Sequence, residues 1–428
     1  MLDAALRHVS RERLAERLRQ IVDIPSPTGE ELALARHLAE ELAAAGLAPE
    51  VQHIDDSQGN ALGRYGGDRG AELLLYAPTD TAFSGNPDED RPWLGDRPGS
   101  DLRLPAVVEA GKVIGLGAEN PKSFVAVILE AVTALAATRA DVPGRVTAGF
   151  GAGGMPNSGR PGLARRDIGH GAGCRHLVEK AGRPDFAIIV KPGYAVSWEE
   201  VGLSWHTVRV RGLRNYTGIR HKVPWRNPIV DAARVIGRLE AWFPEYSARH
   251  TSGLVSPQGS VNAVRAGSGD LSAFVPELCE LFLDIRVSPR SSPEQVAAEL
   301  KSVLDGLCAE DPGLDLSAEM TVGIPGTHTP PESWIVGSLI RAWETAEGRR
   351  HQPPSGTSGA TDAAILRGLG IPTARIGPPA PRTPNPPTGF SMGVADVESL
   401  ERLTRLLLRA IVDTVTRSRD ALGLAPRP

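Results

Sequence analysis

Residues 72–81, ELLLYAPTDT, decide the fold of this 428-residue chain. Their apolar run is strand-like, and similar runs follow at 144–150 (GRVTAGF) and 185–191 (DFAIIVK). Helical patterns separate these runs, most clearly over 122–138. Alternation of strands and helices favours a mostly parallel sheet that is covered by helices. The sequence therefore predicts an α/β fold.

A second pattern begins near Val201. It predicts a compact α+β domain, with strands at 204–212, 277–287 and 314–322 and helices at 227–243 and 292–308. The α/β pattern lies on both sides of it, with further helices at 10–23, 29–46, 333–346 and 396–417 and a strand at 371–377. We therefore predict a discontinuous α/β domain, residues 1–200 and 323–428. An α+β domain, residues 201–322, is inserted into it as a lid or dimerisation domain.

Composition narrows the class of protein. The chain is longer than a single domain with one hydrophobic core usually is, so two domains are expected. Its content of 41% hydrophobic and 23% charged residues is normal for a globular protein. A net charge of −4 gives no electrostatic reason to expect nucleic acid or an anionic membrane as a partner. The N-terminus carries frequent charges instead of a secretory signal, and the longest apolar stretch, 124–137, is too short to span a bilayer. The three cysteines form no disulfide framework, so we expect a cytoplasmic protein.

Four motifs lie in or beside these elements: LLLYAPTDT (73–81), GLGAENPKS (115–123), GAGGMPNSG (151–159) and DFAIIVKPG (185–193). Together with the order of elements, they resemble the zinc-dependent amidohydrolase and exopeptidase family. That family includes acetylornithine deacetylase, succinyl-diaminopimelate desuccinylase, aminoacylase and carboxypeptidase G. The resemblance covers nearly the whole chain.

The resemblance implies a site for two zinc ions, held by two His, a bridging Asp and further carboxylates, with a Glu as general base. In the family pattern G-H-x-D-T, the metal-binding His position holds Pro78 here, although Asp80 and Thr81 remain. In the pattern G-x-G-x-x-D-x-K-G, Asn120 stands in place of the bridging Asp, while Lys122 persists. Proline has no donor atom for a metal, and asparagine is a neutral, weak ligand.

The remaining ligand positions are also changed. The family's Glu-Glu pair corresponds to Gly153 and Gly154, and the carboxylate that follows D-x-x-I-V corresponds to Lys191. The final His falls on Arg382 or, in a second register, on Gly389. We therefore expect no metal, no cofactor and no hydrolysis by the zinc mechanism of the family.

Other residues fall on family positions outside the metal site. Tyr216 stands where the inserted domain of the family often carries a His that reaches the partner subunit's site, and its hydroxyl is a candidate oxyanion donor. Packing at a domain interface is an equally good interpretation of Tyr216. Arg286 and Asp362 match positions that brace the structure. His170, Cys174 and His176 have the residue types of a zinc site, but we expect a loop without metal there.

The predicted cleft nevertheless gathers polar groups. The candidate catalytic residues are Asp80, Lys191, Glu119 and Tyr216, and the candidate substrate-binding residues are Asn120, Lys122 and Arg382. Lys122 and Lys191 would offset the missing zinc charge and bind a carboxylate or phosphate, and a desolvated Lys is able to act as base or nucleophile. Asp80 or Glu119 would be the partner acid or base. The alternative is an internal salt bridge of Lys191 with Asp80 or Glu119.

Three hypotheses for function follow. The first is a metal-independent enzyme for an amino-acid- or peptide-like small molecule, by acyl transfer, amide formation, cyclisation or proton transfer. The second is a catalytically inactive homologue that binds a ligand or a partner protein. The third is a zinc amidohydrolase with unrecognised ligands. The resemblance also implies a homodimer formed through the inserted domain, with the helix at 227–243 and the strand at 204–212 as candidates.

Overall fold

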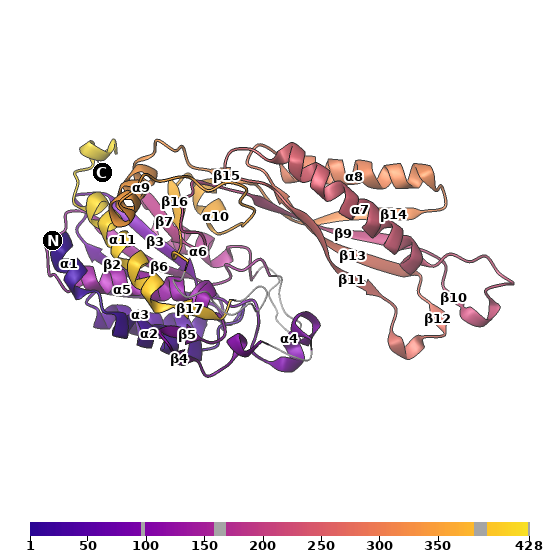
Figure 1. The fold of residues 1–428 in the computed structure, drawn as a ribbon, viewed down its shortest axis with the longest axis horizontal. Helices are drawn as coiled ribbons and strands as arrows, with labels where there is room; N and C mark the ends of the chain where they lie inside the picture. Colours follow the sequence, from indigo (N-terminus) through magenta and orange to yellow (C-terminus); the bar gives the residue numbers. More distant parts are fainter. Residues whose placement is uncertain (96–98, 158–167, 381–391, 427–428) are drawn as a thin grey trace. The chain divides into compact units, whose positions relative to one another are not determined.

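The computed structural model describes residues 1–95, 99–157, 168–380 and 392–426. The chain divides into two compact units (Figure 1). Unit 1 comprises Met1–Trp198, Thr329–Pro353 and Thr361–Pro428, and unit 2 comprises Glu199–His328 and Pro354–Ala360. The inserted domain had been predicted over 201–322. Residues 354–360 also belong to unit 2, and the sequence pattern does not predict this second segment.

A six-stranded sheet forms the centre of unit 1, in the order β1-β2-β6-β3-β7-β16. Strand β3 is parallel to β6 and β7, and β7 is parallel to β16, whereas β1 and β2 are antiparallel to their neighbours. The strands are β1 (Ala48–His53), β2 (Gly59–Gly66), β3 (Glu72–Pro78), β6 (Arg145–Gly151), β7 (Phe186–Val190) and β16 (Thr373–Ile376). The predicted mostly parallel α/β sheet is thus confirmed.

Helices cover both faces of this sheet because its central strands are apolar on both sides. In β3, Leu73 and Leu75 belong to one core cluster, and Leu74 and Tyr76 belong to another on the opposite face. The first face is covered by α1 (Leu2–His8), α2 (Arg11–Asp23), α5 (Ser123–Ala136), α9 (Trp334–Glu347) and α11 (Val397–Val415). The second cluster contains residues of α6 (Ala172–Ala181) and α10 (Ala363–Gly368).

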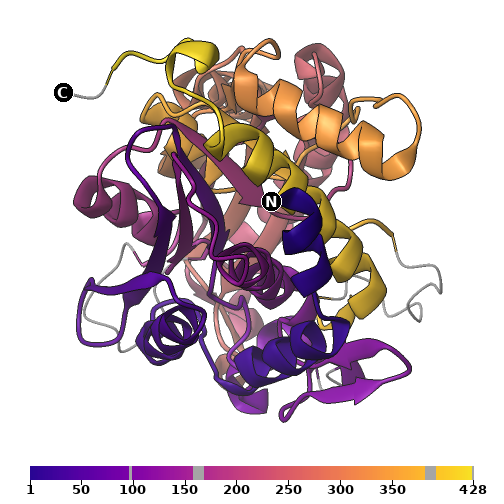
Figure 2. The same ribbon diagram turned by 90° about the vertical axis from the view of Figure 1, so that its left-hand side faces the viewer.

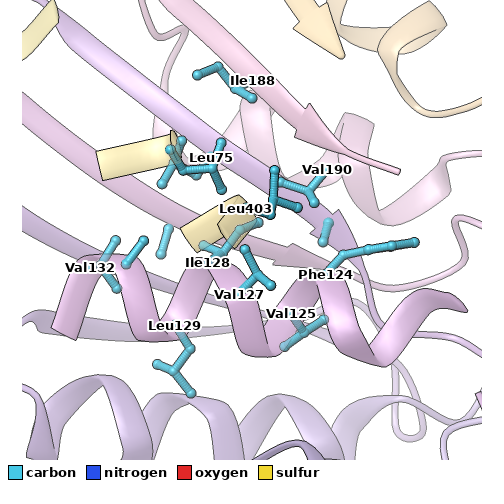
Figure 3. Packing of buried hydrophobic residues seen from close by; sticks show 14 of the residues in the cluster. Leu75, Phe124, Val125, Val127, Ile128, Leu129, Val132, Ile188, Val190 and Leu403 are labelled. Atoms are coloured by element: carbon cyan, nitrogen blue, oxygen red, sulfur yellow. The ribbon is translucent and has the colours of Figure 1, made fainter. Parts of the chain in front are cut away.

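Helix α5 is the centre of the larger core. Every residue of α5 except Thr133 is buried. Its side chains, including Ile128, lie among Leu75 of β3, Ile188 of β7 and Leu403 of α11 (Figure 3). The terminal helices α1 and α11 lie side by side (Figure 2), and Arg405 of α11 donates to the carbonyl of Leu6 at 3.1 Å. The two ends of the chain are therefore built into one core.

Smaller elements flank the sheet in unit 1. Helix α3 (Leu32–Ala44) packs against β1 and β2. Helix α4 (Pro87–Leu94) precedes a three-stranded sheet of β4 (Val107–Glu109), β5 (Lys112–Ile114) and β17 (Val394–Asp396). A π-helical turn, η2 (Ala118–Lys122), leads from β5 into α5. It carries the predicted residues Glu119, Asn120 and Lys122.

Unit 2 is an antiparallel sheet in the order β11-β13-β9-β14, with α7 (Pro228–His250) and α8 (Pro293–Glu310) packed on it. The strands are β9 (Gly202–Arg211), β11 (Gly259–Ala266), β13 (Leu278–Val287) and β14 (Asp315–Ile324). Two short pairs, β8 (Glu199–Glu200) with β15 (Thr327–His328) and β10 (Asn215–Tyr216) with β12 (Phe274–Val275), complete it.

One expectation about unit 2 is wrong. The strand at 204–212 was a candidate for pairing across a dimer, but it is β9, which is hydrogen-bonded to β13 on one side and β14 on the other. Both of its edges are therefore occupied. The edge strands of this sheet are β11 and β14.

Within the described residues, no helix combines the length and apolarity that crossing a bilayer demands. The longest apolar stretch of the sequence is α5, which is buried in the core of unit 1.

Candidate functional site

The carboxyl ends of four parallel strands bring the predicted residues of unit 1 toward one edge of the sheet. Thr79–Thr81 follow β3, Ala152–Met155 follow β6, and Lys191 follows β7. Gly377–Ala380 follow β16. In open α/β sheets, ligands bind beyond the carboxyl ends of the strands. We therefore take this edge as the candidate site.

Asp80 is fully buried at this edge and is held by three donors. Its Oδ1 accepts from the backbone N–H of Gly154 at 2.7 Å. Its Oδ2 accepts from the N–H of Met155 at 2.9 Å and from the Thr28 hydroxyl at 2.7 Å. Burial raises the pKa of Asp80, and these hydrogen bonds and the charge of Lys191 oppose that rise. Asp80 is thus a buried carboxylate that fixes the turn after β6.

Glu31 is a second buried carboxylate, and the sequence analysis missed it. Its Oε1 accepts from the N–H groups of Gly29 at 3.0 Å and Gly153 at 2.9 Å, and its Oε2 accepts from Gln58 at 3.2 Å. The pKa of Glu31 is raised, first by burial and second by the negative charge of Asp80. Three successive N–H groups, those of Gly153, Gly154 and Met155, therefore face two carboxylates.

Pro78 and Gly154, two of the positions where the family has metal ligands, touch each other. A Cβ atom on Gly154 would lie 2.9 Å from Pro78 Cγ, closer still to Pro78 Cβ, and 2.7 Å from Asp362 Oδ2. Asp362 is itself held by the hydroxyl of Tyr76 at 2.7 Å. Gly153 has a φ of +61° and also lacks room for a side chain, since a Cβ would collide with the carbonyl of Ile168. A glutamate therefore fits at neither glycine.

Lys191 brings a positive charge to this edge. It is buried, it directly follows β7, and its backbone N–H donates to the carbonyl of Ile376 at 3.1 Å. The charge of Lys191 favours the ionised form of Asp80 and lowers the pKa of that carboxyl against the effect of burial. A cation thus stands on the strand end where the family has a carboxylate.

Glu119 and Asn120 lie on η2 at the start of α5. The Asn120 amide donates from Nδ2 to the sulfur of Met392 at 3.8 Å, but its Oδ1 is buried and has no hydrogen-bond partner within the part of the chain that is described. Glu119 lines a pocket of about 130 Å³. Burial raises the pKa of the Glu119 carboxyl, and the negative charge of Asp101 adds to the rise.

The Lys122 side chain reaches the end of α2. Its ammonium donates to the carbonyl of Ile24 at 2.6 Å and to that of Val22 at 3.4 Å, which belong to the end of α2. Burial lowers the pKa of Lys122 to about 7, although the charge of Asp23 opposes this. Through these hydrogen bonds Lys122 stabilises the end of α2. They give no support to the substrate-binding role predicted for Lys122.

Two predicted residues remain, Tyr216 and Arg382. Tyr216 lies in unit 2 at 47% exposure, where its ring packs against Phe274 at a centroid distance of 5.6 Å. Arg382 and Gly389, the alternatives for the final His, lie outside the described residues. In unit 2, Arg286 pairs with Asp284 at 2.8 Å.

The resemblance assigns zinc ligands to positions where the described side chains supply few donor groups. Pro78, Gly153 and Gly154 offer no side-chain donor, Asn120 offers a neutral oxygen, and Lys191 is a cation. Across the described ranges, no group of three or more His, Cys, Asp or Glu is arranged to hold a metal ion. Cys174 and His176, predicted in a loop, lie on helix α6, and Cys174 is fully buried.

Relatives are found by sequence and by structure. The succinyl-diaminopimelate desuccinylase of Stutzerimonas stutzeri (strain A1501) is 25% identical over 84% of this chain and 87% of its own. The acetylornithine deacetylase of Proteus mirabilis (strain HI4320) is 24% identical over 92% and 95%. Two solved structures share the fold. The di-peptidase Dug1p from Saccharomyces cerevisiae has a TM-score of 0.72 and 12% identity, with 97% of this chain and 99% of that chain covered. Human carnosine dipeptidase 1 has a TM-score of 0.70 and 15% identity, with the same coverage of 97% of this chain and 99% of that chain.

The resemblance seen in the motifs is therefore confirmed at the level of the family. The model of Peptidase family M20/M25/M40 matches residues 74–413, which run from the strand that decides the fold to the last helix. The chain belongs to peptidase family M20/M25/M40.

Proposed function

We propose that this chain carries out amide or acyl chemistry on an amino-acid- or peptide-like small molecule, without a dinuclear zinc site. The close contact between Pro78 and Gly154 carries the proposal. Where zinc ligands would have to project into a shared space, a proline ring lies against a glycine backbone. Relatives named desuccinylase and deacetylase support the substrate class.

Electrostatics supports the same proposal. A pair of divalent cations needs several anionic ligands, and the carboxylates of Asp80 and Glu31 are both fully buried and already hydrogen-bonded to the turn after β6. Lys191 would add a repulsive charge to any metal at this strand end. The same charge is favourable to an anion.

The proposed roles follow from this arrangement. The ammonium of Lys191 supplies the positive charge that the carbonyl oxygen of a substrate requires as negative charge develops on it. Asp80 is a positioning residue, since it is fully buried and keeps a negative charge opposite Lys191. The Oδ1 of Asn120, which has no hydrogen-bond partner among the described residues, accepts an N–H of the substrate. Tyr216 and Arg382 remain proposed contributors from unit 2 and from outside the described residues.

Metal-free enzyme tests this proposal. Protein stripped with a chelator should turn over succinyl-diaminopimelate, N-acetylornithine or a dipeptide as fast as untreated protein. Lys191→Met should reduce kcat by about 10²–10³, the usual cost of losing one group that stabilises an oxyanion. Lys180→Met, which removes an exposed lysine on α6, is the matched control. Unchanged turnover in Lys191→Met would refute the assigned role, and activity that zinc alone restores would support a zinc amidohydrolase.

A second candidate is a homologue that binds such a molecule without transforming it. Gly153 and Gly154 favour it, because neither contributes a side chain where the family has its general base. In this case the same compounds raise the melting temperature of the protein but are recovered unchanged. Turnover above the level of a Lys191→Met preparation excludes this candidate.

We also propose that the chain forms a homodimer through unit 2. The sheet there ends in β11 and β14, and Val264 of β11 is 54% exposed. Unpaired strand edges with exposed apolar residues are suited to association. Sedimentation equilibrium distinguishes the dimer from a monomer, and Val264→Lys should shift the equilibrium toward the monomer. A cytoplasmic location is proposed from the three free cysteines.

A further inference from the structure

The tip of unit 2, residues 211–226 and 266–276, carries a group of exposed apolar side chains. It lies at the end of the sheet where β9 ends and β13 begins (Figure 1). Strand β10 leads into a short 3-10 helix, η3 (Thr217–Ile219), and another, η4 (Gly269–Leu271), precedes β12. Exposed apolar residues that are scattered singly are ordinary, whereas a group of them marks an interaction surface. The group on these segments comprises Leu213, Tyr216, Ile219, Leu271 and Phe274.

The fold holds this apolar group in a defined place. The N–H of Thr217 donates to the carbonyl of Ala273 at 3.0 Å, which ties η3 to the segment before β12. Tyr216 and Phe274 stand opposite each other in the pair of β10 and β12, with ring centroids 5.6 Å apart. Leu271 nevertheless remains 61% exposed and Phe274 53% exposed. The chain therefore orders these side chains without burying them.

Basic residues accompany the apolar group. Between 201 and 230 the chain has no Asp or Glu, and its Lys and Arg residues there are Arg209, Arg211, Arg214, Arg220, Lys222 and Arg226. Arg209 and Arg226 form ion pairs with carboxylates of unit 2. The four others are exposed, and no ion pair involves them in the part of the chain that is described. The one acidic residue of 266–276, Asp270, accepts from the Ser268 hydroxyl at 3.1 Å. Positive charge is therefore in excess at the tip, although the whole chain has a net charge of −4.

A partner for this surface has to accept apolar carbon and positive charge together. Nucleic acid offers phosphates, but the aliphatic side chains of Leu213, Ile219 and Leu271 cannot stack on bases as aromatic rings do. An acidic protein would need a cavity that matches the two short helices. An anionic lipid surface offers phosphates at its headgroups and hydrocarbon just below them, and it needs no matching shape. Charge and apolar character together favour the lipid surface.

We propose that the tip of unit 2 binds an anionic lipid surface. The side chains of Ile219, Leu271 and Phe274 enter the boundary between headgroups and acyl chains, while Arg220 and Lys222 contact lipid phosphates. The contact is interfacial and involves no spanning segment. It goes beyond the proposed function, because it concerns where the chain acts and not which molecule it transforms.

Co-sedimentation of the intact chain with vesicles tests the inference. Vesicles of phosphatidylcholine alone are compared with vesicles of phosphatidylcholine mixed with phosphatidylglycerol, which is anionic. We expect binding to the mixed vesicles only, and weaker binding at high salt because salt screens the charges. Leu271→Ser should weaken binding about tenfold, through the loss of one inserted side chain. Lys222→Gln should weaken it about fivefold, through the loss of one positive charge near the surface.

Two matched controls lie outside the tip. Val108→Ser removes an exposed apolar residue of β4, and Lys180→Gln removes an exposed lysine of α6, so both variants should bind as the unchanged chain does. The inference is wrong if the mixed vesicles are not bound, if both kinds of vesicle are bound equally, or if Leu271→Ser and Lys222→Gln bind normally. Sedimentation velocity without vesicles gives one more check. If Leu271→Ser dissociates a dimer there, the tip binds a second copy of the chain and the lipid assignment is overturned.

Discussion

At the scale of single residues, Gly154 shows how closely the turn after β6 packs against the end of β3. The flanking motifs were sufficient to place Pro78, Asn120, Gly154 and Lys191 on family positions from the sequence. They did not indicate that Pro78 and Gly154 touch, because a contact between β3 and the turn after β6 is a property of the fold. Glu31 was missed for the same reason, since its partner Gly153 lies 122 residues away in sequence.

Gly154→Ala tests this packing. The added methyl group would collide with Pro78 and Asp362, so the variant should lose about 1–3 kcal/mol of unfolding free energy, the usual cost of overpacking. Gly306→Ala in α8 is the matched control. A Cβ there meets nothing within 4 Å, and alanine favours the helix by about 1 kcal/mol. Urea denaturation of both variants measures the difference, and equal effects would contradict the account of this contact.

The buried ammonium of Lys122 makes the stability of the folded chain depend on pH. Its pKa is about 7 in the folded chain and 10.5 in its ordinary state, so the unfolded chain holds more protons between these pH values. The contribution of Lys122 to the free energy of unfolding therefore rises with pH in this window, by up to about 1.4 kcal/mol per unit, and is constant below pH 7. Lys122→Met should lose this slope in urea denaturation at pH 6–9, whereas Lys180→Met should keep it. An unchanged slope in Lys122→Met would contradict the lowered pKa assigned to Lys122.

At the scale of elements, the long helices and the strands with an apolar or alternating pattern were predictable, whereas strands interrupted by glycine and polar residues were not. The ranges expected for β3, β6, α5 and α11 agree with the observed ones within a few residues. Strands β2 (GNALGRYG) and β11 (GSVNAVRA) were missed, because glycine and polar residues interrupt any apolar period in them. They form through pairing with neighbours, which short sequence windows do not contain.

Helix α5 is the element on which the site depends most. It follows η2 directly, and its buried side chains hold it against the parallel strands. Ile128→Ala should cost about 2–5 kcal/mol of unfolding free energy, since Ile128 is fully buried at the centre of the core. Val230→Ala in α7, at a residue that is 59% exposed, should change it by less than about 0.5 kcal/mol. A small effect of Ile128→Ala would mean that the core is not packed as described.

At the scale of the whole molecule, the chain has a separate core in each unit. Ile128 belongs to the core of unit 1, and Leu300 belongs to that of unit 2. Native-state hydrogen exchange on Ile128→Ala and Leu300→Ala should show faster exchange confined to the unit that carries each substitution. Uniform acceleration in both units would indicate one cooperative body. The sequence predicted the inserted segment from its change of pattern, but the return at 354–360 depends on pairing, since Thr357 donates to the carbonyl of Leu254.

Zinc stoichiometry tests most directly whether this chain has the family fold without the metal ligands of the family. The purified chain is dialysed against buffer that contains zinc, next to a zinc-binding member of the family as a positive control, and bound metal is measured by plasma mass spectrometry. Since Pro78, Gly154 and Lys191 provide no anionic ligand, we predict no bound zinc above the level of the dialysis buffer. Two equivalents of zinc per chain, with turnover that depends on them, would contradict the account.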